Sequence, residues 1–210
     1  MSGIASFFIE GGIWMIPIGI ASAFALAIAI ERFYALYILF PVDGRALTTR
    51  IFKSIRDNQI TDGIKACDVK PDAALSRVLK AGLMRTDEGI SSVQNAMEEA
   101  TMEVIPSIQK RGGSLASIAS LATLLGLLGT VMGLIEAFRV VAEAPMDQKS
   151  ILLTKSISVA MNTTAFGLLV AIPVMVAHLA VSGRIKKLVE DIDQYSLKME
   201  NVLASRRSAK

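Results

Sequence analysis

Three long stretches without any Asp, Glu, Lys or Arg constrain this chain more than any other feature. They cover residues 11–30, 112–135 and 156–183, and they are 20, 24 and 28 residues long. An α-helix needs about 20 apolar residues to cross the hydrocarbon core of a bilayer. Helix is the expected conformation there, because the bilayer core offers no water to the backbone. A chain of 210 residues is too short to bury three such helices in a soluble core, so we predict three transmembrane helices.

The distribution of basic residues predicts the orientation of these helices. Of the 22 Lys and Arg residues, 12 fall in residues 31–111 and 7 in residues 184–210, whereas only three fall in residues 136–155. Cytoplasmic loops are enriched in Lys and Arg, so the first two segments are predicted to be cytoplasmic. The first ten residues contain neither Lys nor Arg. We therefore expect a retained first helix with its N-terminus outside, rather than a cleavable signal peptide.

The expected fold is an all-α membrane protein whose long helices extend into a cytoplasmic helical domain. The predicted parts, in chain order, are a short periplasmic N-terminus at 1–10, a transmembrane helix at 11–30, a cytoplasmic helical loop at 31–111, a transmembrane helix at 112–138, a periplasmic connection at 139–154, a transmembrane helix at 155–183 and a cytoplasmic helical tail at 184–210.

Composition argues against most soluble functions. Hydrophobic residues make up 52% of the chain and charged residues 20%, which indicates an apolar part separated from a charged part. The single cysteine, Cys67, excludes an intrachain disulfide and has no zinc-ligand spacing around it. The single histidine, His178, argues against histidine metal sites and Ser-His-Asp triads. A net charge of +3 without a basic stripe argues against nucleic-acid binding. We expect no metal, no cofactor and no enzymatic activity.

Apolar residues at helical spacing predict helices in the loop and the tail. One run follows Pro71 and contains Leu75, Val78, Leu79 and Leu83; a second begins at Thr86-Asp87-Glu88 and contains Val93, Ala96, Met97, Ala100 and Val104. The second run is expected to lead into the second span, with a kink or loosening at Pro106 and Gly112-Gly113. The tail is predicted to be a solvated helix that covers its neighbours through Ile185, Leu188, Ile192, Tyr195, Met199 and Val202.

Small side chains recur along one face of the second span. Because helices in lipid associate by close packing, such residues let two backbones approach each other. The pattern has a counterpart in the third span, and we call the two stripes together the small-residue seam. The seam consists of Ala116, Ala119, Thr123, Gly126, Thr130, Gly133 and Ala137 in the second span and of Ala160, Thr164, Gly167 and Ala171 in the third.

Two threonines of the seam are expected at the same depth. Thr130 lies 18 residues after Gly112, and Thr164 lies 19 residues before Gly183, in an antiparallel helix. At about 1.5 Å per residue, each lies roughly 27–28 Å from the cytoplasmic end of its helix. One interpretation is packing alone, with each hydroxyl bonded to its own backbone. The alternative is a set of hydroxyls, including that of Thr123, which lines a pore in an assembly of several copies.

Two further residue types in the spans have ordinary interpretations. His178 follows Ala171 by seven residues on the same face, and it is either a satisfied interface histidine or a proton relay. Pro17 and Pro173 are interpreted as helix kinks rather than gates.

Two motifs resemble a known family. The segment Leu124-Leu125-Gly126-Leu127-Leu128-Gly129-Thr130-Val131-Met132-Gly133 resembles the second-span signature of the ExbB/TolQ/MotA proton-channel family, and Thr164-Ala165-Phe166-Gly167-Leu168-Leu169-Val170-Ala171-Ile172-Pro173 resembles its third span. Glu31-Arg32 after the first span is also similar. Three spans with an external N-terminus resemble the ExbB and TolQ branch, whereas MotA-type stators have four spans.

The resemblance implies a bacterial inner-membrane homopentamer around a dimer of a single-span partner similar to ExbD or TolR. A membrane Asp of that partner would take up and release protons, which are the transported ion, and a TonB-like or TolA-like protein would receive the work. Thr130 and Thr164 match threonine positions of the family, and Pro173 matches its third-span proline. The resemblance leaves open which pathway is energised. Bound lipid is a further expectation.

The spans also depart from the family pattern in their charge. ExbB-like members carry a Glu five residues before the third-span threonine, where this chain has Val159. No carboxylate lies inside any of the three charge-free stretches, and proton transfer through a bilayer ordinarily uses an ionisable residue at depth. We therefore expect a partner to supply the titrating acid. The alternative is a non-conducting oligomeric scaffold that organises partner proteins.

Overall fold

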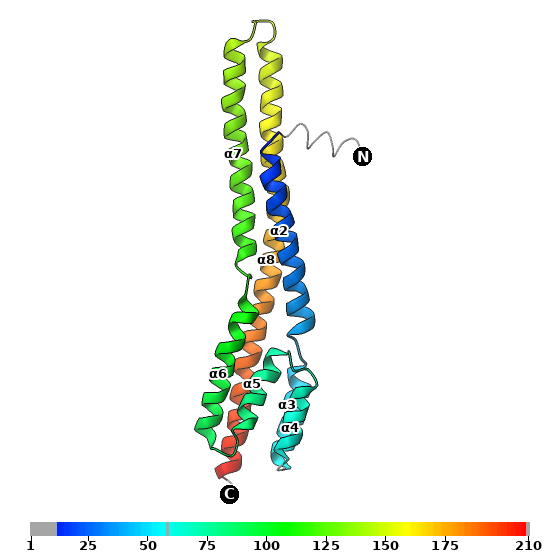
Figure 1. Cartoon of the computed structure of the whole chain (residues 1–210), viewed down its shortest axis with the longest axis vertical. Helices are drawn as coiled ribbons and strands as arrows, with labels where there is room; N and C mark the ends of the chain where they lie inside the picture. Colours follow the sequence, from blue (N-terminus) through cyan, green and yellow to red (C-terminus); the bar gives the residue numbers. More distant parts are fainter. Residues whose placement is uncertain (1–11, 58, 209–210) are drawn as a thin grey trace. The chain divides into compact units, whose positions relative to one another are not determined.

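The computed structural model describes residues 12–57 and 59–208, and every regular element within them is a helix (Figure 1). The predicted N-terminal segment 1–10, and the first residue of the predicted span 11–30, lie outside the described residues. The chain divides into two compact units. The span unit contains described residues 12–30 and 113–180, and the loop–tail unit contains residues 31–112 and the rest of the chain from residue 181.

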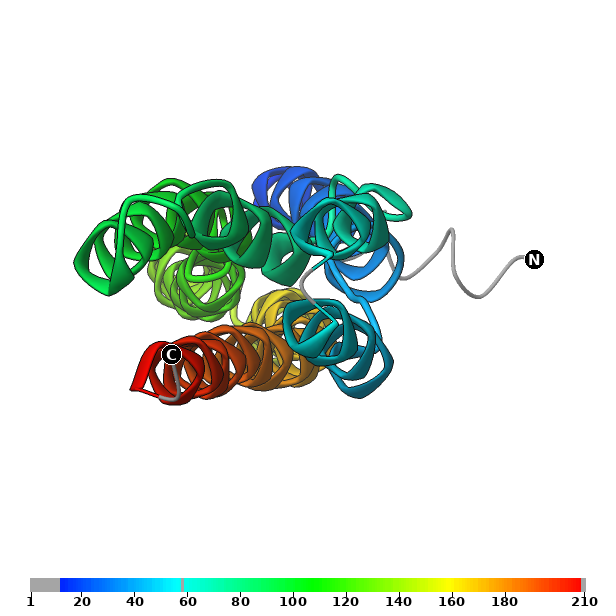
Figure 2. The same cartoon turned by 90° about the horizontal axis from the view of Figure 1, so that it is seen from below.

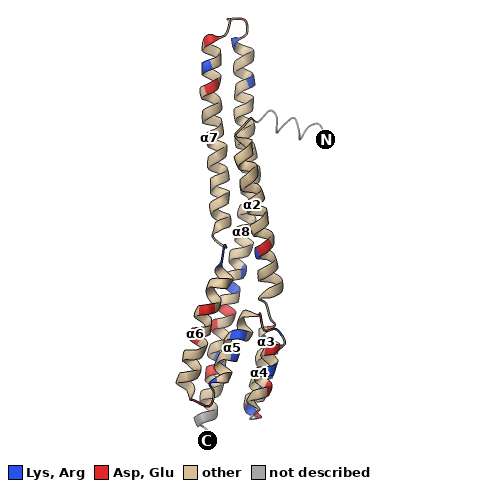
Figure 3. Ribbon diagram, viewed as in Figure 1, with Lys and Arg blue, Asp and Glu red and all other residues tan. Residues whose placement is uncertain are grey.

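Three helices build the span unit: α2 (Met15–Tyr34), α7 (Ser114–Glu143) and α8 (Lys149–Ser208), of which α2 and α8 continue into the loop–tail unit. Each provides a segment that is long and apolar enough to cross a membrane, by length and composition. Figure 3 shows the long stretches of these helices that carry no charged residue. The chain is therefore a multi-pass membrane protein of three spanning helices. Residues 139–143 and 149–154 of the predicted connection are helical, so only residues 144–148 interrupt the two helices.

A small core holds the span unit together, and large apolar side chains cover its outside. Met15 and Ile18 of α2 pack with residues of α7 and α8, the complete cluster being Met15, Ile18, Ala119, Ala122, Phe166, Val170 and Ala171. Many large apolar side chains of the same helices are exposed, among them Leu124, Leu169 and Ile172. A soluble protein rarely exposes such a surface, whereas a lipid environment accepts it.

The two prolines of the spans have different positions in their helices. Pro17 lies in the first turn of α2, where its missing N–H removes no helical hydrogen bond, so the predicted kink at Pro17 is wrong. Pro173 lies inside α8, which continues on both sides of it. A proline inside a helix removes one backbone hydrogen bond and weakens the helix locally. This is the effect on which the interpretation of Pro173 as a kink depends.

The loop–tail unit is a group of short helices beside the C-terminal part of α8. Its elements are the π-helix η1 (Ala35–Leu39) and the helices α3 (Gly44–Arg56), α4 (Ile60–Asp68), α5 (Ala74–Met84) and α6 (Ile90–Gln109). α3 packs on α4, α4 on α5 and α5 on α6. Asp43 caps α3, because its carboxylate accepts hydrogen bonds from the backbone N–H groups of Arg45 and Ala46 at 3.0 and 3.1 Å.

The helical periodicity of the sequence predicts most of the core of this unit. The apolar residues expected on α5 are all buried, as are Val93, Met97 and Val104 of α6. The tail buries Leu188, Ile192, Tyr195 and Met199 as predicted, but its last buried residue is Leu203 rather than Val202. Figure 2 shows α6 and α3 at opposite flanks of the unit, as does Figure 1.

The helix boundaries around α6 differ from those predicted. α6 begins at Ile90, after Gly89 with φ 114°, and not at Thr86-Asp87-Glu88. Only glycine adopts that backbone conformation without strain, so the turn ends at Gly89. At its other end α6 continues through Pro106 to Gln109, and the chain leaves the helix at residues 110–113, where Arg111 has φ 56°. The interruption before Ser114 therefore includes Gly112-Gly113, where a loosening is predicted, whereas Pro106 lies within α6.

The only cysteine gives a test of this core. Cys67 of α4 is 1% exposed, and burial together with the Asp68 carboxylate raises the pKa of its thiol from 9.0 to about 11. At pH 8 this lowers the thiolate fraction from about one in ten to about one in a thousand. We expect Cys67 in the folded protein to react with a maleimide at least about a hundredfold more slowly than a cysteine introduced at exposed Thr61 of the same helix in a Cys67→Ser chain. Equal rates for the two cysteines would contradict the packing of α4.

Candidate functional site: hydroxyl groups between two apolar helices

The site is built on an unusually close approach of α7 and α8. A Cβ atom placed on Gly167 would lie 2.8 Å from the carbonyl oxygen of Ala122 and 3.1 Å from Cα of Gly126. A Cβ atom on Gly133 would lie 2.8 Å from Cβ of Ala160. Only residues without a side chain leave room for backbone at such separations, and this is how small residues allow helices to pack in lipid.

Threonine hydroxyls meet at this contact. Thr164 Oγ1 donates a hydrogen bond to the carbonyl oxygen of Gly126 at 2.8 Å, from one helix to the other. The hydroxyl oxygens of Thr164 and Thr130 lie 3.4 Å apart. The two threonines therefore lie at the same level of the antiparallel pair, as counting residues from the helix ends predicts. Packing alone does not require a hydroxyl here, because valine fills nearly the same volume.

The hydroxyl protons of Thr130 and Thr164 determine which hydrogen bonds this pair can make with a third group. Each hydroxyl carries one proton and two acceptor lone pairs. Thr164 gives its proton to Gly126, and Thr130 gives its proton to the carbonyl oxygen of Leu127 in its own helix at 2.6 Å. With both protons directed at carbonyl groups, the hydroxyl oxygens keep lone pairs that can accept a hydrogen bond from a third group. Rotation of either hydroxyl would instead join the two oxygens through one hydrogen bond.

The seam of α7 divides between two neighbouring faces. Ala119, Gly126 and Ala137 are buried as predicted, whereas Ala116, Thr130 and Gly133 are half-buried. Thr123 is exposed, and its hydroxyl donates to the carbonyl oxygen of Ala119 at 3.1 Å. The packing face of α7 consists of Leu115, Ala119, Ala122, Gly126, Gly129 and Ala137. The 3–4 spacing of small residues fits two adjacent stripes, so the sequence could not distinguish the packed face from the hydroxyl-bearing one.

Sequence reasoning missed Gly129 and Thr163. A Cβ atom on Gly129 would overlap Cγ2 of Thr163, and Thr163 is 1% exposed. The signal was present, since Gly129 lies three residues after Gly126 and Thr163 lies next to Thr164. The hydroxyl of Thr163 donates to the carbonyl oxygen of Val159 in its own helix at 3.1 Å. Thr163 therefore fits the interpretation in which a hydroxyl bonds its own backbone and serves packing alone.

The other predicted residues of α8 lie along the same helix. Ala160 and Ala171 are buried with Gly167, so they belong to the packed face. His178 is half-buried, seven residues after Ala171. It lies 14 residues after Thr164 in the same helix, about 21 Å along its axis, and its role as a proton relay stays a prediction.

Two acidic residues that directly follow charge-free stretches, Glu31 and Glu136, are ion-paired. Glu136 of α7 accepts from Arg139 of the same helix at 2.9 Å. In the loop–tail unit, Glu31 accepts from Arg32 at 2.8 Å and also from Arg111. Arg32 is only 4% exposed, so the Glu31 carboxylate compensates a buried guanidinium. Neither glutamate is positioned as a free acid at the level of the threonines.

Three apolar helices that are long enough to cross a membrane, two of which meet through a threonine hydrogen bond, define a multi-pass membrane protein. The model of the MotA/TolQ/ExbB proton channel family matches residues 70–194, which include the α7–α8 contact. The chain belongs to this family, as the two sequence motifs indicate. A comparison with curated protein sequences finds no match.

The close contact predicts a large effect of one methyl group. Gly167→Ala should lower the free energy of unfolding by about 1–3 kcal/mol, because the new Cβ meets backbone atoms that cannot rotate away. Gly19→Ala of α2 is the matched control, since a Cβ there meets nothing within 4 Å. It should be neutral or stabilise by up to about 1 kcal/mol through helix propensity. Thermal unfolding in detergent measures both, and equal stabilities of the two variants would contradict the contact.

Proposed function

We propose that this protein is the channel-forming stator subunit of a motor in the bacterial inner membrane, which converts proton-motive force into work on periplasmic or outer-membrane machinery. One observation carries the proposal. Within a member of a proton channel family, the hydroxyls of Thr130 and Thr164 lie 3.4 Å apart, in stretches of α7 and α8 that contain no carboxylate. Such a pair can accept a hydrogen bond from a proton donor and orient it while remaining neutral, so it carries no charge into the membrane.

The missing acid is proposed to come from a partner. A single-span protein similar to ExbD or TolR, present as a dimer, would place a membrane Asp beside the threonine hydroxyls. Its neutral, protonated carboxyl would donate to a hydroxyl lone pair, since the hydroxyl protons of Thr130 and Thr164 are directed at carbonyl oxygens. Loss of the proton would weaken that contact and release the partner's side chain. Proton uptake and release would thus change how the partner is held.

Several copies are proposed to surround the partner, in the homopentamer that the resemblance implies. Thr123 is exposed and Ala116 is half-buried, so this side of α7 is free to face a pore or another copy. The exposed large apolar side chains of α2, α7 and α8 would contact lipid or neighbouring copies. The N-terminus and the 144–148 connection are proposed to be periplasmic, and the loop and tail cytoplasmic. The recipient of the work is either a TonB-type or a Tol-type system.

Valine substitutions test the hydroxyls. Thr130→Val or Thr164→Val should lower the rate of the energised process by about tenfold or more, as removal of a positioned proton-transfer group does. Loss of one hydrogen bond costs about 1 kcal/mol, which is too little to prevent assembly. Thr154→Val is the matched control, because exposed Thr154 donates only to Ser150 of its own helix. Normal activity of both test variants, with the complex assembled, would leave the threonines as packing residues only.

Reconstitution tests the division of labour between subunits. Proteoliposomes that contain this chain alone should show little proton flux above protein-free vesicles, and addition of the single-span partner should raise the flux. A pH-sensitive dye inside the vesicles measures it. Strong flux from the chain alone would overturn the requirement for a partner acid. If the complex neither conducts protons nor responds to an uncoupler, it is a scaffold instead.

A further inference from the structure

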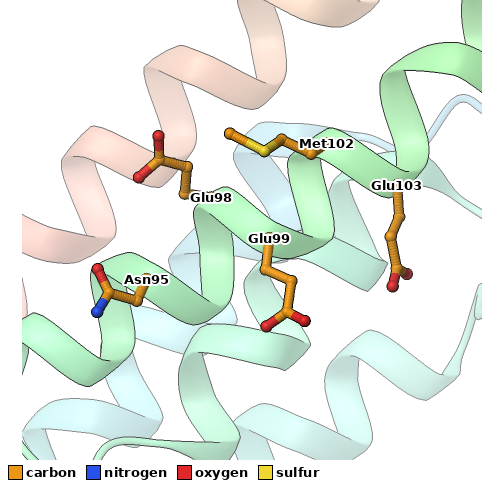
Figure 4. A pocket seen from close by; sticks show the side chains of 5 residues that line it. All are labelled: Asn95, Glu98, Glu99, Met102 and Glu103. Carbon is orange, nitrogen blue, oxygen red and sulfur yellow. The ribbon is translucent and has the colours of Figure 1, made fainter.

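One flank of the loop–tail unit carries a groove with acidic rims. It lies between α6 and α8 and has a volume of about 430 Å³, with Thr101 and Leu197 among its lining residues and Glu98, Asp193 and Glu200 as its acids. Gln94 of α6 donates to Glu200 of α8 at 3.1 Å and so joins the two walls. An adjoining hollow of about 500 Å³ on α6 adds Glu99, Met102 and Glu103 (Figure 4).

Two large apolar side chains are exposed on this flank. The side chains of Met102 and Leu197 are 66% and 60% exposed, although each lies on a helix whose other face is buried. In Figure 4 the side chains of Glu98 and Met102 lie on one side of α6, and the carboxylates of Glu99 and Glu103 lie on the other side. Neither Glu98 nor Glu99 makes an ion pair among the described residues, and Glu103 reaches Arg77 only at 3.8 Å. Exposed apolar side chains beside two acids without an ion pair in the described part of the chain fit a basic helix.

The opposite flank of the same unit carries such a helix. α3 buries Leu47, Ile51 and Ile55 and exposes a basic face. This basic face is defined by Arg45, Thr49, Arg50, Lys53 and Arg56, all of which are exposed. No side chain of its four cations has an ion pair among the described residues. Asp43 caps the first turn of α3, which stabilises the start of the helix that carries the basic face.

We propose that the basic face of α3 in one copy docks into the acidic α6–α8 groove of the next copy. The two surfaces lie at opposite flanks of one unit, so they cannot meet within a chain (Figures 1 and 2). A contact between different surfaces of identical chains is heterologous, and its repetition closes a ring when the rotation allows it. The inference rests on the proposed assembly of several copies and specifies the surfaces that join them outside the membrane.

The energetics give this contact a defined part in assembly. Exposed ion pairs are individually weak and are screened by salt, so the charges select the partner surface and its register. Burial of Met102 and Leu197 adds a contribution that salt does not remove. Packing between the spanning helices of neighbouring copies would then supply most of the affinity of one copy for the next.

Cysteine crosslinking in membranes of cells that express the full chain tests the geometry. Two differently tagged chains are coexpressed, one with Thr49→Cys and the other with Met102→Cys. We expect an oxidant to give a dimer that carries both tags, and little dimer when either variant is expressed alone. Met84→Cys replaces Met102→Cys as the matched control, because Met84 is equally exposed at 64% but lies on α5. Native Cys67 is buried and does not compete. Absence of the mixed dimer, or strong dimers from a single variant, would overturn the proposal.

Charge reversal gives a second readout. Arg45→Glu with Lys53→Glu should lower the mixed crosslink by about fivefold, and Glu98→Lys with Glu99→Lys should do the same. The four substitutions combined should restore the crosslink, because they exchange the two charges. Reversal of Lys110 and Lys187, which are exposed and lie outside α3, is the control and should leave the yield unchanged. Failure of the combined variant to recover would count against direct pairing.

The copy number separates this inference from the proposed function. Intact-mass measurement of the detergent-extracted complex reports it without any crosslink. A single copy would overturn the proposed assembly and this interface together. Several copies without the Thr49–Met102 crosslink would overturn this interface alone.

Discussion

The absence of water from the membrane interior is the constraint on which the rest of this structure depends. Every backbone group there must find its partner within the protein, so the spans are helices, and charges are excluded from them. With no hydrophobic force between helices in lipid, α7 and α8 associate by backbone proximity at Gly126 and Gly167. The same proximity brings Thr164 to the carbonyl oxygen of Gly126. The close packing of α7 and α8 therefore creates the polar site, because it brings the threonine hydroxyl within reach of the facing backbone.

The exclusion of charge from the spans also means that these stretches carry no acid of their own. Hydroxyls can be buried as neutral groups with their protons directed at carbonyl oxygens, as Thr130 and Thr164 are. A carboxylate at the same depth would have to be neutral or paired. The proposed division between a subunit that supplies hydroxyls and a partner that supplies the acid would separate the rigid helix pair from the titrating group. This division is consistent with a site formed by two closely packed helices.

Much of the fold could be predicted from the sequence, because the charge-free stretches and the 3–4 periodicity reflect strong forces. The apolar residues of α5, α6 and the tail helix are buried nearly as expected, and Thr130 and Thr164 meet as counting predicts. Helix ends were less predictable. The break before α7 includes the predicted Gly112-Gly113 pair, but no sequence pattern predicts the left-handed conformation of Arg111 beside it. The packed face of α7 was ambiguous because small residues occupy two adjacent stripes, and only the partner helix selects between them.

The glycine contact has a consequence for the genetics of this protein. In an ordinary core, a substitution that enlarges one side chain can be suppressed by a second substitution that shrinks its neighbour. At the contact of Gly126 with Gly167 both partners are already the smallest residue, and the other atom in reach is a backbone oxygen of Ala122. No second-site change on the facing helix can return the lost space. Suppressors of a variant at Gly167 should therefore fall on residues that let α7 or α8 shift as a whole, away from the contact itself.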